Sequence, residues 1–148
     1  MRIAAYLLCL WIILTLGCSA PKEGRDSLER EFAKRYRDAH ASGEVDNMMA
    51  LFWWKGVSDG ETRFFVKQAL VQEIDYPIKA IYFEDLGPDG GFDYEFQGER
   101  YHPNLKPYSR FVIEFAIEER LTSSFILGKH EERLFFVNAA PVETHLTE

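Results

Sequence analysis

The sequence is poor in cysteine. It contains two, Cys9 and Cys18, and both lie near its start. The rest of the chain has no thiol, which excludes a disulfide framework, a cysteine zinc site and a cysteine nucleophile there. A cluster of basic residues is also missing, and the formal net charge is −7. Because nucleic-acid binding depends on neutralising phosphates, we expect no nucleic-acid partner.

Long hydrophobic runs are absent except at the beginning of the chain. No charged residue occurs from Ile3 to Gly17, behind a single cation, Arg2. A basic start, a short apolar run and a small residue at its end are typical of a secretory signal peptide. The run has about 15 residues, fewer than the roughly 20 that a helix needs to span a bilayer. An uncleaved signal anchor and a buried apolar helix are the alternative interpretations.

The end of this run, Leu14-Thr15-Leu16-Gly17-Cys18, resembles the lipobox of bacterial lipoproteins. The order of Thr15 and Leu16 departs from the commonest lipobox, which has leucine three residues before the cysteine and a small residue two before. The resemblance implies diacylglyceryl transfer to the Cys18 sulfur, cleavage after Gly17, and acylation of the new amino group by a chain such as palmitate. Several acyl chains on one residue anchor a protein firmly. We therefore expect the protein in the bacterial cell envelope, held in the membrane through Cys18. In a Gram-negative cell it would face the periplasm from the outer membrane.

The sequence predicts one folded domain. After a signal peptide over residues 1–17, residues 18–26 are expected to form a polar linker, residues 27–140 a single α+β domain, and residues 141–148 a tail. Aromatic residues make up 15% of the chain and hydrophobic residues 47%, which is enough to build a core. Disorder is therefore not expected in the domain.

Three stretches have the spacing of amphipathic helices. The first begins at Asp26, an N-cap that forms a capping box with Glu29, and ends at Ser42-Gly43. The second covers residues 45–52. The third begins at Ser58 and is expected to bury a stripe of five residues: Phe65, Val66, Ala69, Leu70 and Ile74.

After Pro77 the apolar period changes from 3.6 to 2, which predicts strands. The clearest strand covers residues 110–118, with four residues expected to face the helices: Phe111, Ile113, Phe115 and Ile117. Further strands are expected over residues 78–85, around 92–96, and over residues 121–129 and 133–139. The predicted fold is α+β, with about three N-terminal helices packed on a bent antiparallel sheet of four to five strands.

The stretch from Ala41 to Phe52 (Ala-Ser-Gly-Glu-Val-Asp-Asn-Met-Met-Ala-Leu-Phe) resembles the helix–"SGD"–helix opening of the nuclear-transport-factor-2-like superfamily, the cystatin-related α+β cone. The resemblance implies a long helix across a strongly bent sheet that encloses a conical pocket. It covers the first two helices and the general order of the strands. The chain departs from it where residues 53–57 lead directly into a third helix. The superfamily contains isomerases, cyclases and dehydratases as well as non-enzymatic binding domains, so the resemblance does not fix an activity.

The sequence has no catalytic, cofactor or metal-binding motif, and its four histidines are widely scattered. We therefore expect no cofactor and no metal. Two features could build a ligand pocket. One is the polar ends of side chains on the apolar face of the first helix, and the other is the aromatic residues after the second helix. A third feature is an expected loop around residues 101–103. The candidate pocket consists of six residues: Tyr36, His40, Trp53, Trp54, Tyr101 and His102.

Each of these features has a plainer interpretation. Tyr36 and His40 would lie across the cone if the resemblance holds, but His40 is equally compatible with a half-exposed histidine that closes the first helix. One of the two tryptophans is expected in the core, and the other as a lid or an exposed contact. For the Tyr101-His102 pair the plainer interpretation is a turn nucleated by Pro103.

The leading functional hypothesis is a membrane-tethered, non-catalytic binding or accessory domain. Its partner would be a small apolar ligand in an aromatic-lined pocket, or an envelope protein on an exposed sheet face. The alternatives are a small cone-pocket enzyme of isomerase or hydratase type that uses His40 or His102, and a structural envelope protein without ligand. A pocket of roughly 300 Å³ or more with two ionisable groups favours a binder or an enzyme.

Overall fold

A computed structural model describes residues 24–57, 60–88, 90, 94–96, 98–117 and 121–141. The signal peptide expected over residues 1–17 and the lipid site at Cys18 lie outside these residues. The described helices and strands, in chain order, are α1 (Ser27–Ala41), α2 (Val45–Met49), α3 (Gly60–Glu73), β1 (Ile78–Glu84), β2 (Tyr94–Phe96), β3 (Glu99–Pro103), β4 (Pro107–Phe115), β5 (Thr122–His130), β6 (Arg133–Phe136) and β7 (Ala139–Pro141). No helix in this part of the chain has the length and apolar character needed to cross a membrane.

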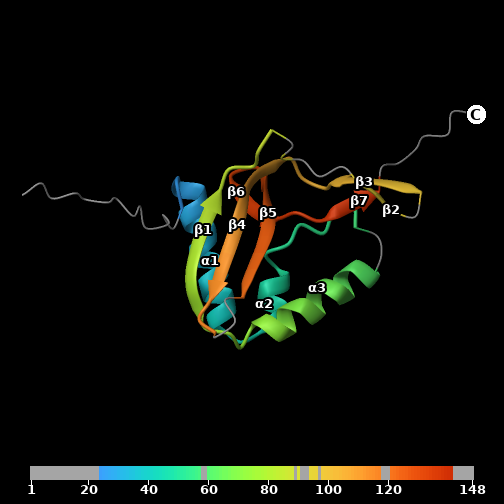
Figure 1. Cartoon of the computed structure of the whole chain (residues 1–148). Coiled ribbons are helices and arrows are strands. Elements are labelled where there is room, and N and C mark those ends of the chain that lie inside the picture. Colours follow the sequence, from blue (N-terminus) through green and yellow to red (C-terminus); the bar gives the residue numbers. More distant parts are fainter. Residues whose placement is uncertain are drawn as a thin grey trace, which may run out of the picture.

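The predicted α+β class and the three helices before the strands are confirmed. The strands form two antiparallel sheets, one in the order β1-β4-β5-β6 and a smaller one in the order β2-β3-β7. Figure 1 shows α1 on one face of the four-stranded sheet, with the smaller sheet beside the upper end of the larger one. Helix α1 therefore covers one face of the larger sheet.

The larger sheet has four strands, within the expected four to five, but the expectation of a single sheet is wrong: β2, predicted around residues 92–96, pairs with β3 and belongs with β7 to a second sheet. Residues 101–103 belong to β3, not to a loop, and they pair with β7, where Tyr101 lies opposite Pro141. The strand expected over residues 133–139 ends at Phe136, and the chain then changes sheet to enter β7. Pairing between segments so far apart leaves no local pattern in the sequence.

The ends of α1 follow the sequence prediction. The Asp26 carboxylate accepts a hydrogen bond from the backbone N–H of Glu29 at 2.9 Å, as an N-cap should. The Glu29 carboxylate accepts a hydrogen bond from the backbone N–H of Arg25 at 2.6 Å. In a capping box it would instead accept from the N–H of the N-cap residue, Asp26. Gly43 follows the helix with a φ of 69°, a backbone conformation that glycine adopts without strain.

Asp26 also ties α1 to the sheet, because it accepts a hydrogen bond from the hydroxyl of Tyr108 in β4. This bond is the main cause that lowers the pKa of Asp26, and the same bond raises the pKa of Tyr108 to about 12. A carboxylate whose pKa is lower in the folded state than in the unfolded state stabilises the fold at pH values above its unfolded pKa. That stability is lost as the pH falls through the folded value.

We therefore expect Asp26→Asn to be less stable than wild type at about pH 7, and the difference to be smaller near pH 2, because protonation of the wild-type carboxyl removes its charge as the pH falls. Asparagine still caps a helix, so the variant removes the charge and keeps the cap acceptor. Urea unfolding of both proteins at the two pH values measures the difference. A difference that is the same at both pH values would contradict the argument.

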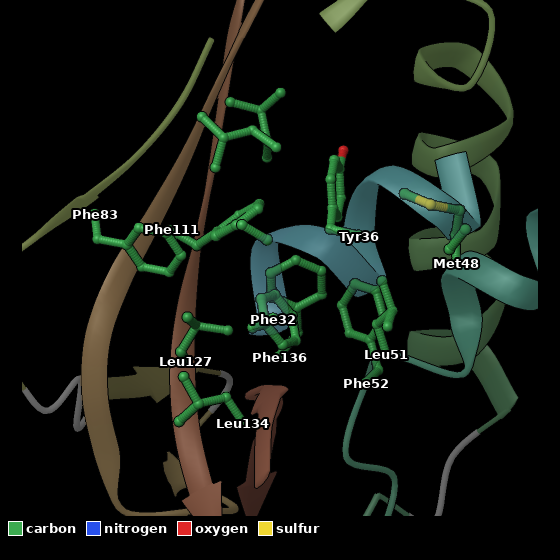
Figure 2. Packing of buried hydrophobic residues seen from close by; sticks show 14 of the residues in the cluster. Phe32, Tyr36, Met48, Leu51, Phe52, Phe83, Phe111, Leu127, Leu134 and Phe136 are labelled. Atoms are coloured by element: carbon green, nitrogen blue, oxygen red, sulfur yellow. The ribbon is translucent and has the colours of Figure 1, made fainter. Parts of the chain in front are cut away.

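The core is built mainly from aromatic rings between α1, the end of α2 and the four-stranded sheet. Phe111 in β4 is fully buried, and four rings lie within 5.5 Å of its ring centroid: Phe32, Tyr36, Phe83 and Phe136. Figure 2 shows these rings converging between the sheet and α1. Ile113 and Phe115 are buried on the same strand, which confirms three of the four residues predicted to face the helices. Ile117 lies beyond the end of β4 and is only partly buried against the core.

The stripe that was expected to be buried on α3 is wrong for most of its members. Only Leu70 is buried among the residues of α3, and the Phe65 side chain is 60% exposed. The inner face of the sheet is already covered by residues of α1 and by Phe52 after α2. Figure 1 accordingly shows α3 to one side, next to α2. Polar contacts such as the 2.9 Å ion pair between Lys67 and Asp46 connect the two helices.

Candidate functional site

The structure separates the six candidate residues instead of bringing them into one cone. Tyr36 and His40 lie on the inner face of α1, while Trp53 and His102 line a pocket at the surface. Trp54 stacks on Phe52, with ring centroids 5.4 Å apart, and its indole N–H donates to the carbonyl of Met49. The hydroxyl of Tyr101 lies within hydrogen-bond distance of Glu99 in the same strand. Two separate sites therefore have to be considered.

The surface pocket has a volume of about 340 Å³ and lies where the loop after α2, strand β3 and the β5–β6 turn meet. This volume lies within the range of small-molecule sites, which begins at roughly 300 Å³. Aromatic and cationic side chains provide much of its surface. Its main lining residues are Trp53, Lys55, His102, Asn104, Leu105 and His130.

Two asparagines hold the loop that carries Trp53. The Asn104 amide donates to the carbonyls of Trp53 and Lys55, at 2.7 and 3.0 Å, and the Asn138 amide donates to Trp53 at 2.8 Å. The two asparagines are also linked to each other, because the backbone N–H of Asn138 donates to the Asn104 side chain at 2.9 Å. Gly56 completes this loop with a φ of 82°, which disfavours any other residue. The pocket is thus preformed.

The chemistry of the pocket differs from that of the protein as a whole. The indole of Trp53 lies 4.3 Å from the imidazole of His130, measured between ring centroids, and 5.2 Å from the ring of Phe135. Lys55 supplies a positive charge, and the described lining residues include no carboxylate. In a protein with a net charge of −7, this pocket offers a flat aromatic surface next to a cation.

The interior site is a group of polar side chains within the core. Tyr36 is fully buried, and its hydroxyl has no hydrogen-bond partner among the described residues. The same holds in this part of the chain for the buried Nε2 atom of His40 and the buried Oε2 atom of Glu73. The rings of Tyr36 and His40 are stacked, with centroids 6.1 Å apart. Ser123 in β5 donates a hydrogen bond to Oε1 of Glu73 and so holds this carboxyl group in place.

The pKa values show that these side chains act on one another. Burial raises the pKa of Tyr36, and the charge of Glu73 raises it further. Burial also raises the pKa of Glu73, against the opposing effects of the Ser123 hydrogen bond and of the His40 charge. The interior site therefore combines residues of α1, α3 and β5, all within one electrostatic environment.

Sequence reasoning missed several residues of both sites. Lys55 and His130 carry no sequence signal that points to a pocket. Asn104 has no sequence signal, because its role depends on a loop some fifty positions away. Glu73 and Ser123 were missed because strands β1 to β4 separate them along the chain. A glutamate near the end of a helix looks like an ordinary solvated residue.

Comparison of the chain with known protein families, curated proteins and solved structures finds no match. Among the described residues, no group of three or more His, Cys, Asp or Glu side chains is placed to hold a metal ion. A function for the protein is therefore best argued from the two sites themselves.

Proposed function

We propose that the protein is a lipoprotein of the bacterial cell envelope whose folded domain binds a small ligand without catalysing a reaction. The observation that carries the binding role is the preformed 340 Å³ pocket with Trp53 and His102 in its wall. The location rests on the sequence alone, on the signal peptide and on Cys18. Together they describe a binding domain held close to the membrane by a short linker.

The pocket favours a ligand that has an apolar ring and a negatively charged group. The ring would stack against Trp53 and His130, since aromatic rings and flat apolar groups attract one another. The negative group would lie near Lys55, which has no carboxylate beside it among the described lining residues. A benzoate-like molecule has this chemistry.

We also propose that α1 and the four-stranded sheet correspond to the helix and bent sheet of the nuclear-transport-factor-2-like cone. The support is that α1 lies across one face of the sheet and that the register of β4 shifts against both neighbours. Such irregularities are β-bulges, which bend a sheet. A superposition of an experimental structure on a member of the superfamily tests this proposal. A different strand order would reject it.

A ligand screen on the mature protein, purified in detergent, tests the binding role. We expect aromatic carboxylates to change the tryptophan fluorescence saturably and to raise the melting temperature, because Trp53 lies in the pocket wall. Lys55→Ala and His102→Ala should each weaken binding by about tenfold, as expected for the loss of one charged or polar partner.

The matched control is Lys34→Ala, because Lys34 is an exposed lysine on α1 that does not line this pocket. It should leave the affinity unchanged. The proposal is rejected if no aromatic carboxylate binds. It is also rejected if Lys55→Ala and His102→Ala both bind every hit as tightly as wild type does.

A further inference from the structure

A groove along α1 is lined by basic side chains. Its described lining residues are Arg30, Ala33, Lys34 and Arg37, of which only Ala33 is buried. In the sequence, acidic and apolar residues stand between these cations, so that no basic cluster is visible. Residues three and four positions apart share one side of an α-helix, and the folded helix therefore gathers the three positive charges along one groove.

The described part of the chain begins beside this groove. Gly24 is buried, and it packs so closely on Arg30 that a side-chain carbon at residue 24 would lie 2.7 Å from the Arg30 backbone nitrogen. Arg30 is also the first cation of the groove along the chain. The segment that connects Gly24 to Cys18 therefore joins the domain at one end of the basic groove.

The charges around the groove leave it attractive to anions. Arg25, which lies next to Gly24, is already engaged by two carboxylates, those of Glu29 and Asp85. Lys34 forms an ion pair with Asp38 at 2.6 Å, but both side chains are exposed, and an exposed pair of this kind holds its partners weakly. The described lining of the groove contains no acidic residue. The groove is therefore a basic surface on a protein whose net charge is −7.

We propose that this groove docks on the phosphate headgroups of an anionic phospholipid surface, so that α1 lies along the membrane. The proposal rests on the lipid anchor of the proposed function. The segment from Cys18 to Gly24 spans at most about 20 Å, so the anchor keeps Arg30 close to the headgroups and makes docking an intramolecular event. Each lysine or arginine near an anionic lipid surface strengthens binding by about fivefold.

The acidity of the protein gives this docking a direction. Because the net charge is −7, an anionic bilayer repels the domain as a whole and attracts it where cations gather. The groove gathers cations next to the point where the anchor segment joins the domain. The domain is therefore held in one orientation, with the basic side of α1 towards the lipid, instead of rotating freely about the linker.

Quenching of a fluorophore on α1 by labelled lipid headgroups tests the proposal. Ala41 is exposed at the end of α1, one helical turn after Arg37. In the lipidated mature protein Cys18 is acylated and Cys9 is gone, so Ala41→Cys provides the single free thiol for the fluorophore.

Phosphatidylcholine with a nitroxide on its headgroup quenches this fluorophore on contact. We expect strong quenching in vesicles that also contain phosphatidylglycerol and weak quenching in vesicles of phosphatidylcholine alone. The difference should disappear in about 0.5 M NaCl, because salt screens exposed charges.

Arg30→Gln/Lys34→Gln in the labelled protein should lower the ratio of docked to undocked protein by at least about tenfold, as expected for the loss of two cations. Glutamine keeps the Cγ atom that lies against Gly24. The matched control is Arg63→Gln/Lys67→Gln, which removes the same two residue types at the same spacing from α3. It should dock as the labelled parent does. Circular dichroism and the melting temperature establish that each variant is folded.

Flotation with phosphatidylcholine vesicles separates failure of this proposal from failure of the anchor. Protein that floats with these neutral vesicles is anchored, and equal quenching in both kinds of vesicle then overturns the docking proposal alone. Protein that does not float has no anchor, which overturns the proposed location and the docking proposal together.

Three further outcomes overturn docking on lipid. The first is unchanged quenching in the folded Arg30→Gln/Lys34→Gln variant, and the second is an equal loss of quenching in the control. The third is release of the domain by inorganic phosphate at an ionic strength where chloride has no effect, which would show that the groove binds a free anion instead.

Discussion

Phe111→Ala is expected to lower the free energy of unfolding by about 3–5 kcal/mol. Phe111 is fully buried in β4, at the point where the helices and the sheet meet. Its ring lies 5.3 Å from Phe32 of α1 and 5.2 Å from Phe83 of β1, with the ring planes nearly perpendicular. Truncation therefore removes hydrophobic burial and several edge-to-face contacts, and it leaves a cavity that rigid neighbouring strands cannot fill.

Phe65→Ala is the matched control, because it makes the same chemical change at a phenylalanine that is 60% exposed on α3. Its expected cost is below about 0.5 kcal/mol. Urea unfolding curves of the two variants, with the free energies extrapolated to water, measure both effects. Equal losses would mean that α3 packs more tightly than its exposure indicates, or that β4 does not present Phe111 to the core.

The contrast between these two phenylalanines shows which parts of the fold the sequence could predict. In β4 Phe111, Ile113 and Phe115 recur with a period of 2 and are buried as predicted, although Val112 on the other face is buried as well. In α3 the spacing of apolar residues has the period of a helix, and the helix forms. Of the expected stripe, however, only Leu70 is fully buried, while Val66 and Ile74 pack partly buried against the core and Phe65 is exposed. Periodicity predicts which residues share a face. It does not predict whether a neighbour is available to cover that face.

The candidate sites divide in the same way. Sequence reasoning selected Trp53 and His102, and the structure places both in one pocket wall, although they come from segments on either side of α3 and β1. It also selected Tyr36 and His40, which the structure places together in the interior. The partners that give each pair its chemistry, Glu73 above all, come from other elements and depend on tertiary packing that no local pattern encodes.

Two observations connect the proposed anchor with the described fold. Residues at the end of the expected linker already belong to the folded part, since Asp26 caps α1 and bonds to Tyr108. The segment from Cys18 to Gly24 can span only about 20 Å when fully extended. A lipid on Cys18 would therefore keep the start of α1 near the membrane surface and limit how far the ligand pocket can move from it.

Cys18→Ser is expected to abolish lipidation completely, because diacylglyceryl transfer requires the thiol that serine lacks. In cells grown with labelled palmitate, the wild-type protein should carry the label and Cys18→Ser should carry none. The variant should also keep its signal peptide, and hence a larger mass than the mature wild-type protein. Cys9→Ser is the matched control, because Cys9 lies within the same apolar run and would be removed with it.

The control should be labelled and processed like wild type. Since both cysteines precede the described fold, neither change should alter folding of the domain, and urea unfolding of the two variants should give the same midpoint as wild type. Labelled palmitate on Cys18→Ser, or loss of label from Cys9→Ser alone, would place the lipid elsewhere. The short linker would then no longer hold the pocket near the membrane, and the proposed function would have to be argued for a domain that is free to diffuse.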